Sequence, residues 1–127
     1  MILSTYAARL EDTLRSRTEI TIVELRSRVT QDYAAFTARV HFYDGSQLFI
    51  SDEISLAENR QIVRDEYVFH YQRADNTLIF RYDNSPHFPN LPTFPAHKHT
   101  PDGVISSAAP DLADVLREID RFLYPDR

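Results

Sequence analysis

The chain has 127 residues, carries a formal net charge of −5 and contains no cysteine. An apolar content of 43% is typical of a globular protein, and the length suits one core, so we expect a single domain over residues 1–127. The lack of cysteine excludes disulfides, thiolate metal sites and a cysteine nucleophile. The 2 glycines exclude Walker and dinucleotide-binding loops, which need several glycines at fixed spacing.

The charged residues limit the partners that the chain can bind. An acidic chain argues against broad electrostatic contact with nucleic acid, although a local site is still compatible with it. Of the 14 basic residues, one is Lys98 and the others are arginines, which suit bidentate contacts with phosphate. No apolar run approaches the roughly 20 residues that span a bilayer, and the first residues do not form a signal peptide. We therefore expect a cytoplasmic protein without a membrane partner.

The middle of the chain predicts a sheet. Alternating or β-branched residues predict five strands, which cover residues 19–29, 34–43, 47–54, 61–73 and 77–83. Short turns join these strands, and Asp44–Gly45 favours the positive φ angles of a tight hairpin. Because consecutive strands with short connections pair with each other, the predicted sheet is an antiparallel meander.

Two amphipathic helices flank the predicted sheet. Apolar residues at helical spacing predict one helix over residues 4–16. A second helix is predicted from Pro110, which suits a first helical position, to the residues before Pro125. Each helix has one apolar face that can pack on a sheet. The expected fold class is therefore α+β, a five-stranded antiparallel meander packed with an N-terminal and a C-terminal helix.

A proline-rich stretch over residues 81–99 follows the last predicted strand. Its prolines recur at every third residue, at positions 86, 89, 92 and 95. This spacing is the period of a polyproline II helix, which has three residues per turn. Phe88, Leu91 and Phe94 would share one side of such a helix. We therefore expect these three side chains to be largely buried and the prolines to be more exposed.

Three of the five histidines lie in this stretch. On a strand, His97 and His99 would share a face and could both bind a metal ion, and His87 could add a third ligand. The more common alternative is that such imidazoles hydrogen-bond backbone carbonyls in a loop. Neither cysteine nor a Glu-x-x-His pattern accompanies them, so the ligand set is incomplete. We therefore expect no metal and no other cofactor.

The same stretch contains the residue types that metal-independent RNA cleavage requires. That reaction needs a base for the 2′-hydroxyl, a cation for the charged phosphorane and an acid for the leaving oxygen, and histidine titrates near neutrality. The candidate catalytic residues are His87, His97, His99 and Arg81. The candidate substrate-binding residues are Lys98, Tyr82 and Asp83.

Structural explanations stand beside these assignments. Arg81 and Asp83 share a face of the predicted strand over residues 77–83, where a surface ion pair would explain them equally well. Asp83 also begins a good turn sequence. His41 and His70 lie inside predicted strands and are more often structural than catalytic in such positions.

The order of residues in this stretch resembles a small prokaryotic family. Residues 82–87 are similar to its Tyr-Asp-Asn-x-Pro-His motif, and residues 94–99 are similar to its Phe-Pro-x-His-Lys-His segment. The family is known as TumE-like and contains toxins of type II toxin–antitoxin pairs. The resemblance extends from the N-terminal helix to the last helix. It implies an intracellular toxin that acts on RNA and is neutralised by a cognate antitoxin, but it supplies no catalytic residues.

Two functional hypotheses follow. The first is a toxin that acts as a metal-independent ribonuclease. The alternative is a non-enzymatic binding module whose proline stretch is held by a partner, as aromatic-lined grooves hold PxxP segments. The residues leave open whether the chain is an enzyme and whether it forms a homodimer.

Overall fold

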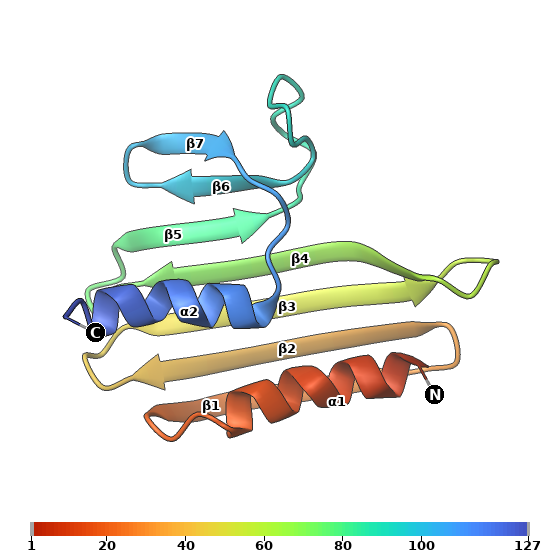
Figure 1. The fold of residues 1–127 in the computed structure, drawn as a ribbon, viewed down its shortest axis with the longest axis horizontal. Coiled ribbons are helices and arrows are strands. Elements are labelled where there is room, and N and C mark those ends of the chain that lie inside the picture. Colours follow the sequence, from red (N-terminus) through yellow and green to blue (C-terminus); the bar gives the residue numbers. More distant parts are fainter. Residues whose placement is uncertain (1, 127) are drawn as a thin grey trace.

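The computed structural model describes residues 2–126, which form a seven-stranded sheet and two helices (Figure 1). The elements in chain order are α1 (Ile2–Arg15), β1 (Ile20–Val29), β2 (Tyr33–Phe42), β3 (Gln47–Leu56), β4 (Ile62–Gln72), β5 (Leu78–Asp83), β6 (His97–Thr100), β7 (Gly103–Ser106) and α2 (Leu112–Leu123). Each strand pairs antiparallel with the next one, so the strand order is β1 to β7. The α+β class and the antiparallel meander are confirmed, with two strands more than predicted.

Both helices lie on the same face of the sheet, and the core lies between them and the strands (Figure 1). The inward-facing side chains of the central strands and of α2 are buried there, among them Phe36, Ile50, Phe69, Tyr71, Val115 and Ile119. Burial of each large apolar side chain contributes about 1.5–3 kcal/mol. Within residues 2–126 no helix covers the opposite face, which we call the open face. The open face is therefore available for a functional site.

α2 begins later than the sequence predicted. Asp111 is the N-cap, and its side chain accepts a hydrogen bond of 2.7 Å from the Asp114 backbone N–H. The Asp114 side chain accepts from the Asp111 N–H at 3.2 Å, which completes a capping box. Pro110 therefore precedes the N-cap and is not the first helical residue. Neither α1 nor α2, the helices of the described chain, is long and apolar enough to cross a membrane.

The two additional strands are β6 and β7, a short hairpin that extends the sheet beyond β5. β6 consists of His97 to Thr100 and has no apolar residue, so it lacks the alternation that identifies a strand in a sequence. β7 has only 4 residues. Pairing with β5 stabilises β6, and this tertiary contact is not visible in the local sequence.

The proline-rich stretch does not form the predicted polyproline II helix. It folds into successive tight turns in which Leu91 N–H donates to Phe88 O and Phe94 N–H donates to Leu91 O. The four prolines are exposed as expected. The expected burial is wrong, because Phe88 and Leu91 are only half-buried and Phe94 is 43% exposed. Backbone turns replace the three-residue period, so the three side chains no longer share one side.

Candidate functional site

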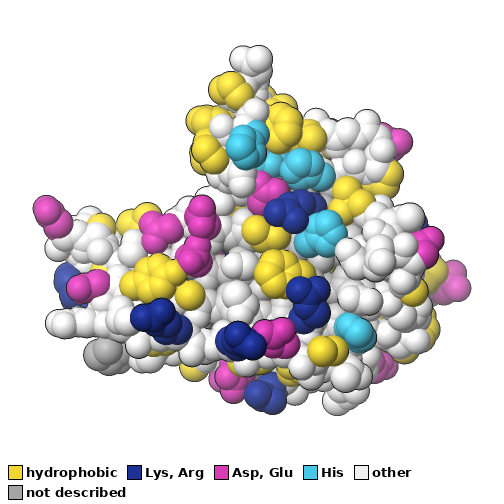
Figure 2. Space-filling model, turned by 180° about the vertical axis from the view of Figure 1, so that it is seen from behind, with side chains coloured by type: hydrophobic (Ala, Val, Ile, Leu, Met, Phe, Trp, Pro, Cys, Tyr) yellow, Lys and Arg dark blue, Asp and Glu magenta, His cyan; other side chains and the backbone are white. Residues whose placement is uncertain are grey.

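Cross-strand pairing brings polar side chains from three strands together on the open face. In the β5–β6 pair, Asp83 lies opposite His97, and Arg81 lies opposite His99. His70 of β4 lies opposite Arg81. Directly paired residues have their side chains on the same face of a sheet, so the five form one group. We call His70, Arg81, Asp83, His97 and His99 the histidine–aspartate cluster. Figure 2 shows histidine, basic and acidic side chains meeting below the projecting loop.

The carboxylate of Asp83 lies at the centre of this cluster. Its side chain is 4% exposed, with Oδ1 at 2.9 Å from His97 Nε2 and Oδ2 at 2.9 Å from Arg81 Nε. Oδ1 also accepts a hydrogen bond of 3.0 Å from the Ser85 backbone N–H. Burial acts to raise the pKa of Asp83, but the Ser85 and Arg81 hydrogen bonds and the nearby His97 outweigh it, so the pKa is lowered. Asp83 is therefore a carboxylate at neutral pH.

His97 and His99 meet at their Nε2 atoms, which lie 3.1 Å apart. The His97 side chain is 1% exposed, and its Nδ1 lies 2.9 Å from the Pro95 carbonyl oxygen. A carbonyl can only accept a hydrogen bond, so His97 Nδ1 carries a proton. The His99 side chain is 29% exposed, and partial burial lowers its pKa. The lowered pKa favours the neutral form of His99, whose imidazole is partly exposed at the surface.

Arg81 connects this group to His70. One terminal nitrogen of the half-buried Arg81 guanidinium lies 3.3 Å from His70 Nδ1, which must accept because a guanidinium only donates. His70 Nε2 then donates to Gln72 Oε1 at 3.0 Å. Burial lowers the pKa of His70, and this favours the same neutral form. Arg81 is 36% exposed and can therefore present its other N–H groups to a ligand.

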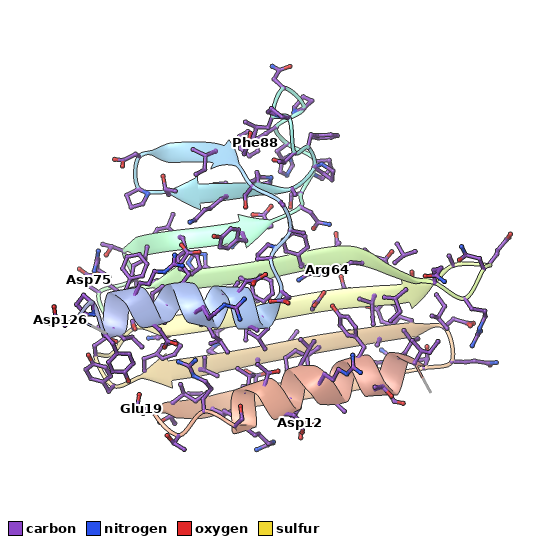
Figure 3. All side chains as sticks on the ribbon, in the orientation of Figure 1. Asp12, Glu19, Arg64, Asp75, Phe88 and Asp126 are labelled. Atoms are coloured by element: carbon purple, nitrogen blue, oxygen red, sulfur yellow. The ribbon has the colours of Figure 1, made fainter. Side chains whose placement is uncertain are left out.

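Phe88 packs against both histidine rings. Its ring centre lies 4.8 Å from that of His97 and 5.8 Å from that of His99, and both contacts are edge-on. Figure 3 labels Phe88 where the proline loop approaches the β6–β7 hairpin. The ring excludes water from one side of the cluster, so access is limited to the side where His99 and Arg81 are partly exposed.

Lys98 and Tyr82 lie on the helix-covered face, away from the histidine–aspartate cluster. Lys98 Nζ donates to Glu118 Oε2 at 2.7 Å, and the Tyr82 hydroxyl donates to the other oxygen of Glu118. Burial acts to lower the pKa of Lys98, but the hydrogen bonds to Glu118 and Tyr82 raise it more. Burial and then Glu118 raise the pKa of Tyr82. The two residues attach β5 and β6 to α2 and do not join the histidines.

His87 is also separate from the cluster. It is exposed at the start of the proline loop, and its backbone N–H donates to Ser85 O at 2.8 Å. Its imidazole has no hydrogen-bond partner within residues 2–126. Of the seven candidates from the sequence, the structure therefore brings together Arg81, Asp83, His97 and His99.

Two residues of the site were not among the candidates. The sequence analysis assigned His70 a structural role and expected Phe88 in the core. Strand alternation in β4 puts His70 on the face opposite Tyr67, Phe69 and Tyr71, and this signal could have identified it as an open-face residue. No such signal exists for Phe88, because its position depends on the turns of the loop.

The cluster combines groups suited to two kinds of chemistry. A neutral imidazole at His99 can accept a proton, and Arg81 can neutralise an anion beside it. In addition, Asp83, His97 and His99 each offer one metal-ligating atom, and these three atoms lie within 4.8 Å of one another. The site can therefore support acid–base chemistry on a phosphate or hold a cation.

Comparisons with known proteins identify the family. A search of curated proteins and a search of solved structures gave no match. The family model described as Toxin TumE matches residues 7–123, which is nearly the whole chain. Membership implies a role as the toxin of a toxin–antitoxin system and a cognate antitoxin as partner. The chain belongs to the TumE toxin family.

Proposed function

We propose that this toxin acts on RNA and cleaves its backbone at the histidine–aspartate cluster. One observation carries the proposal: on the open face, contacts of 2.9–3.1 Å run from the partly exposed Arg81 to Asp83, from Asp83 to His97 and from His97 to the neutral imidazole of His99. His99 supplies the base and Arg81 the cation that metal-independent RNA cleavage requires, and water supplies the acid for the leaving oxygen.

In the proposed reaction, the neutral imidazole of His99 takes the proton of the RNA 2′-hydroxyl. The 2′-oxygen attacks the adjacent phosphorus, and Arg81 neutralises the charge that develops on the phosphorane. The 5′-oxygen leaves and takes up a proton from water, which gives a 2′,3′-cyclic phosphate. His97, held by Asp83 at 2.9 Å and by Pro95, fixes the position of the His99 ring. His97 is therefore a positioning residue.

A row of cationic and aromatic side chains provides a path for RNA across the open face. The residues pair directly from β2 to β6 and are Arg39, Phe49, His70, Arg81 and His99. Neighbouring strands lie about 4.8 Å apart, so the row is about 19 Å long. Arginines bind phosphates, and an accessible aromatic ring can stack on a base. This local row supports RNA binding by a chain whose net charge is −5.

Bacterial growth provides the test. Expression of the toxin alone should slow growth and degrade cellular RNA, and co-expression of the adjacent gene should relieve both effects. Arg81→Ala should lose toxicity and keep its melting temperature, because Arg81 is partly solvated. Arg26→Ala is the matched control, since Arg26 lies on the edge strand β1, is 79% exposed and should remain fully toxic.

The outcomes separate the two functional hypotheses. A folded Arg81→Ala variant with full toxicity would remove Arg81 from the mechanism. A wild-type chain that leaves RNA intact at high expression would favour a non-enzymatic binding module. His97→Ala is a poorer test, because His97 is buried and its loss would reduce stability as well as activity.

A further inference from the structure

We propose that Asp83, His97 and His99 form a binding site for one divalent transition-metal ion, with Zn²⁺ as the best match. The inference concerns the same side chains as the proposed RNA cleavage and deepens that proposal, but metal binding can be measured without RNA. No metal was expected from the sequence because neither cysteine nor a Glu-x-x-His pattern accompanies the histidines, so the ligand set was incomplete. The structure adds the carboxylate of Asp83 from the neighbouring strand.

The distances between the ligand atoms fit a metal ion. His97 Nε2 lies 2.9 Å from Asp83 Oδ1 and 3.1 Å from His99 Nε2, and His99 Nε2 lies 3.4 Å from Asp83 Oδ2. With metal–ligand bonds of about 2.0–2.1 Å, neighbouring ligand atoms are about 3.3–3.4 Å apart in a tetrahedron and about 2.8–3.0 Å apart in an octahedron. The two Asp83 distances involve different carboxylate oxygens, and with one ligand atom from each residue all three atoms lie within 4.8 Å of one another. Rotation of the Asp83 carboxylate and the His99 ring would bring the three atoms to one ion.

The hydrogen-bond pattern also favours a cation between these atoms. Because Pro95 O accepts a hydrogen bond from His97 Nδ1, the other ring nitrogen of His97, Nε2, is the one that points into the cluster. This nitrogen lies 2.9 Å from Asp83 Oδ1 and 3.1 Å from His99 Nε2, so the ligand atoms converge on one point. One metal ion would satisfy all three ligand atoms at once.

The groups around the ligands resemble the outer shell of a metal site. A metal-binding histidine usually donates its other N–H to a carbonyl or carboxylate, as His97 does to Pro95 O. Arg81 and the Ser85 N–H hold the carboxylate of Asp83 in a fixed orientation. Arg81 Nε bonds Oδ2, so a lone pair of Oδ1 can still face the ion. The ligands are therefore positioned before any ion binds.

The ligand types indicate which ions the site prefers. Two imidazoles and one carboxylate suit Zn²⁺ and related first-row ions, whereas Mg²⁺ and Ca²⁺ prefer oxygen ligands. Three protein ligands also leave a fourth position for water or a substrate oxygen, as in catalytic zinc sites. That position would face the side on which His99 and Arg81 are partly exposed.

Metal binding has a direct consequence for the proposed RNA cleavage. The His99 Nε2 lone pair can accept a proton or bind a metal ion, but it cannot do both at once. Saturating Zn²⁺ should therefore inhibit cleavage that uses His99 as the base, and EDTA should restore it.

Cobalt absorption tests the site directly. The full chain, stripped with EDTA and dialysed, should bind about one Co²⁺ with the visible bands of a low-symmetry site, and Zn²⁺ should displace it. A 100-fold excess of Mg²⁺ should not displace the bound Co²⁺. His99→Ala should weaken Co²⁺ binding at least tenfold, whereas the control His41→Ala, on β2 and outside the cluster, should bind as the wild type does.

Asp83→Asn provides a second ligand variant, with circular dichroism as the check on folding. Absence of a Co²⁺ spectrum in the folded wild type would overturn the proposal, as would wild-type affinity in folded His99→Ala.

Cobalt binding by a chain that leaves RNA intact would refute only the RNA proposal. Cleavage in EDTA by a chain that binds no Co²⁺ would refute only the metal site. Cleavage that requires Zn²⁺ would support the metal site and exclude His99 as a free base.

Discussion

Two buried aspartates lie on opposite faces of the sheet, and each is paired with an arginine. Asp52, on the helix-covered face, accepts hydrogen bonds from the Tyr6 hydroxyl at 2.9 Å and from Arg64 Nε at 3.1 Å. Arg64 also donates to Pro110 O at 2.6 Å, so this network joins α1, β3, β4 and the segment before α2. Asp83, on the open face, instead meets two histidines beside a partly exposed arginine.

The difference between these networks separates a structural role from the functional role that we propose. Arg64 is covered by packing and lies 4.2 Å from the Tyr67 ring centre, near the start of α2 (Figure 3). Burial raises the pKa of Asp52, and Arg64 and Tyr6 offset this only in part. The pKa of Asp83 is lowered despite its burial. A buried ion pair is therefore not by itself a sign of function; access for a ligand and neighbouring proton acceptors distinguish Asp83.

The largest predicted effect is on stability, from Asp52→Ala. This change leaves Arg64, which is only 23% exposed, and the Tyr6 hydroxyl without their partner, so we expect the free energy of unfolding to fall by up to about 3–5 kcal/mol. Asp83→Ala should lower the free energy of unfolding by less, because the Arg81 side chain can rotate into the solvent. Urea denaturation of both variants measures the difference. Equal losses would show that the two networks do not differ as described.

Replacing Arg81 should affect catalysis more than stability, and replacing Arg64 should do the opposite. Arg81→Ala should lower the rate of RNA cleavage about 10²–10³-fold through loss of charge stabilisation, with little change in melting temperature. Arg64→Ala should mainly lower the melting temperature, since it leaves the buried Asp52 with only the neutral Tyr6 hydroxyl as a side-chain partner among residues 2–126. Asp83, by contrast, keeps His97 and the Ser85 N–H when Arg81 is removed. Single-turnover cleavage below the melting transition measures the rates. A folded Arg64→Ala variant that loses as much activity as Arg81→Ala would contradict the assignment of roles.

Phe88 and Phe94 offer a smaller comparison within the proline loop. Phe88→Ala removes the ring contacts with His97 and His99, so we expect a loss of about 0.5–1.5 kcal/mol in stability and a modest loss of activity. Phe94→Ala should change stability by less than about 0.5 kcal/mol, because Phe94 is an exposed residue of the same loop. Urea denaturation and RNA cleavage assays measure the stability and the activity of both variants. Equal effects of the two changes would argue against Phe88 as a cover for the cluster.

The smallest predicted effect is a pH dependence from Asp52. Because its pKa is raised in the folded state, Asp52 favours folding when protonated, and this contribution is lost as pH rises from the ordinary value of 3.8 through the folded-state pKa. Asp52→Asn removes this titration. The stability of the wild type relative to Asp52→Asn should therefore fall with rising pH, by at most about 1.4 kcal/mol per pH unit. A difference that stays constant over this range would contradict the raised pKa.

More of the fold than of the candidate site could be predicted from the sequence. Alternation identified the five longer strands and showed that Arg81 and Asp83 share a face. It could not identify β6, since His97 to Thr100 are polar and are held in a strand by pairing with β5. Register between β5 and β6 decides which side chains meet, and the long proline-rich connection between these strands does not fix it as a short turn would. The sequence grouped Lys98 with the histidines because residues 97–99 carry no strand pattern, although alternation along β6 places Lys98 on the other face.

The central claim is that the open-face cluster, and not the buried network around Asp52, performs the chemistry. RNA cleavage by purified His99→Ala and His41→Ala, in EDTA and at equal folded fraction, tests it most directly. The account predicts that His99→Ala cleaves at least about 100-fold more slowly than the wild type, as expected for loss of a general base, while His41→Ala matches the wild type. A folded His99→Ala variant that cleaves RNA at the wild-type rate would contradict it.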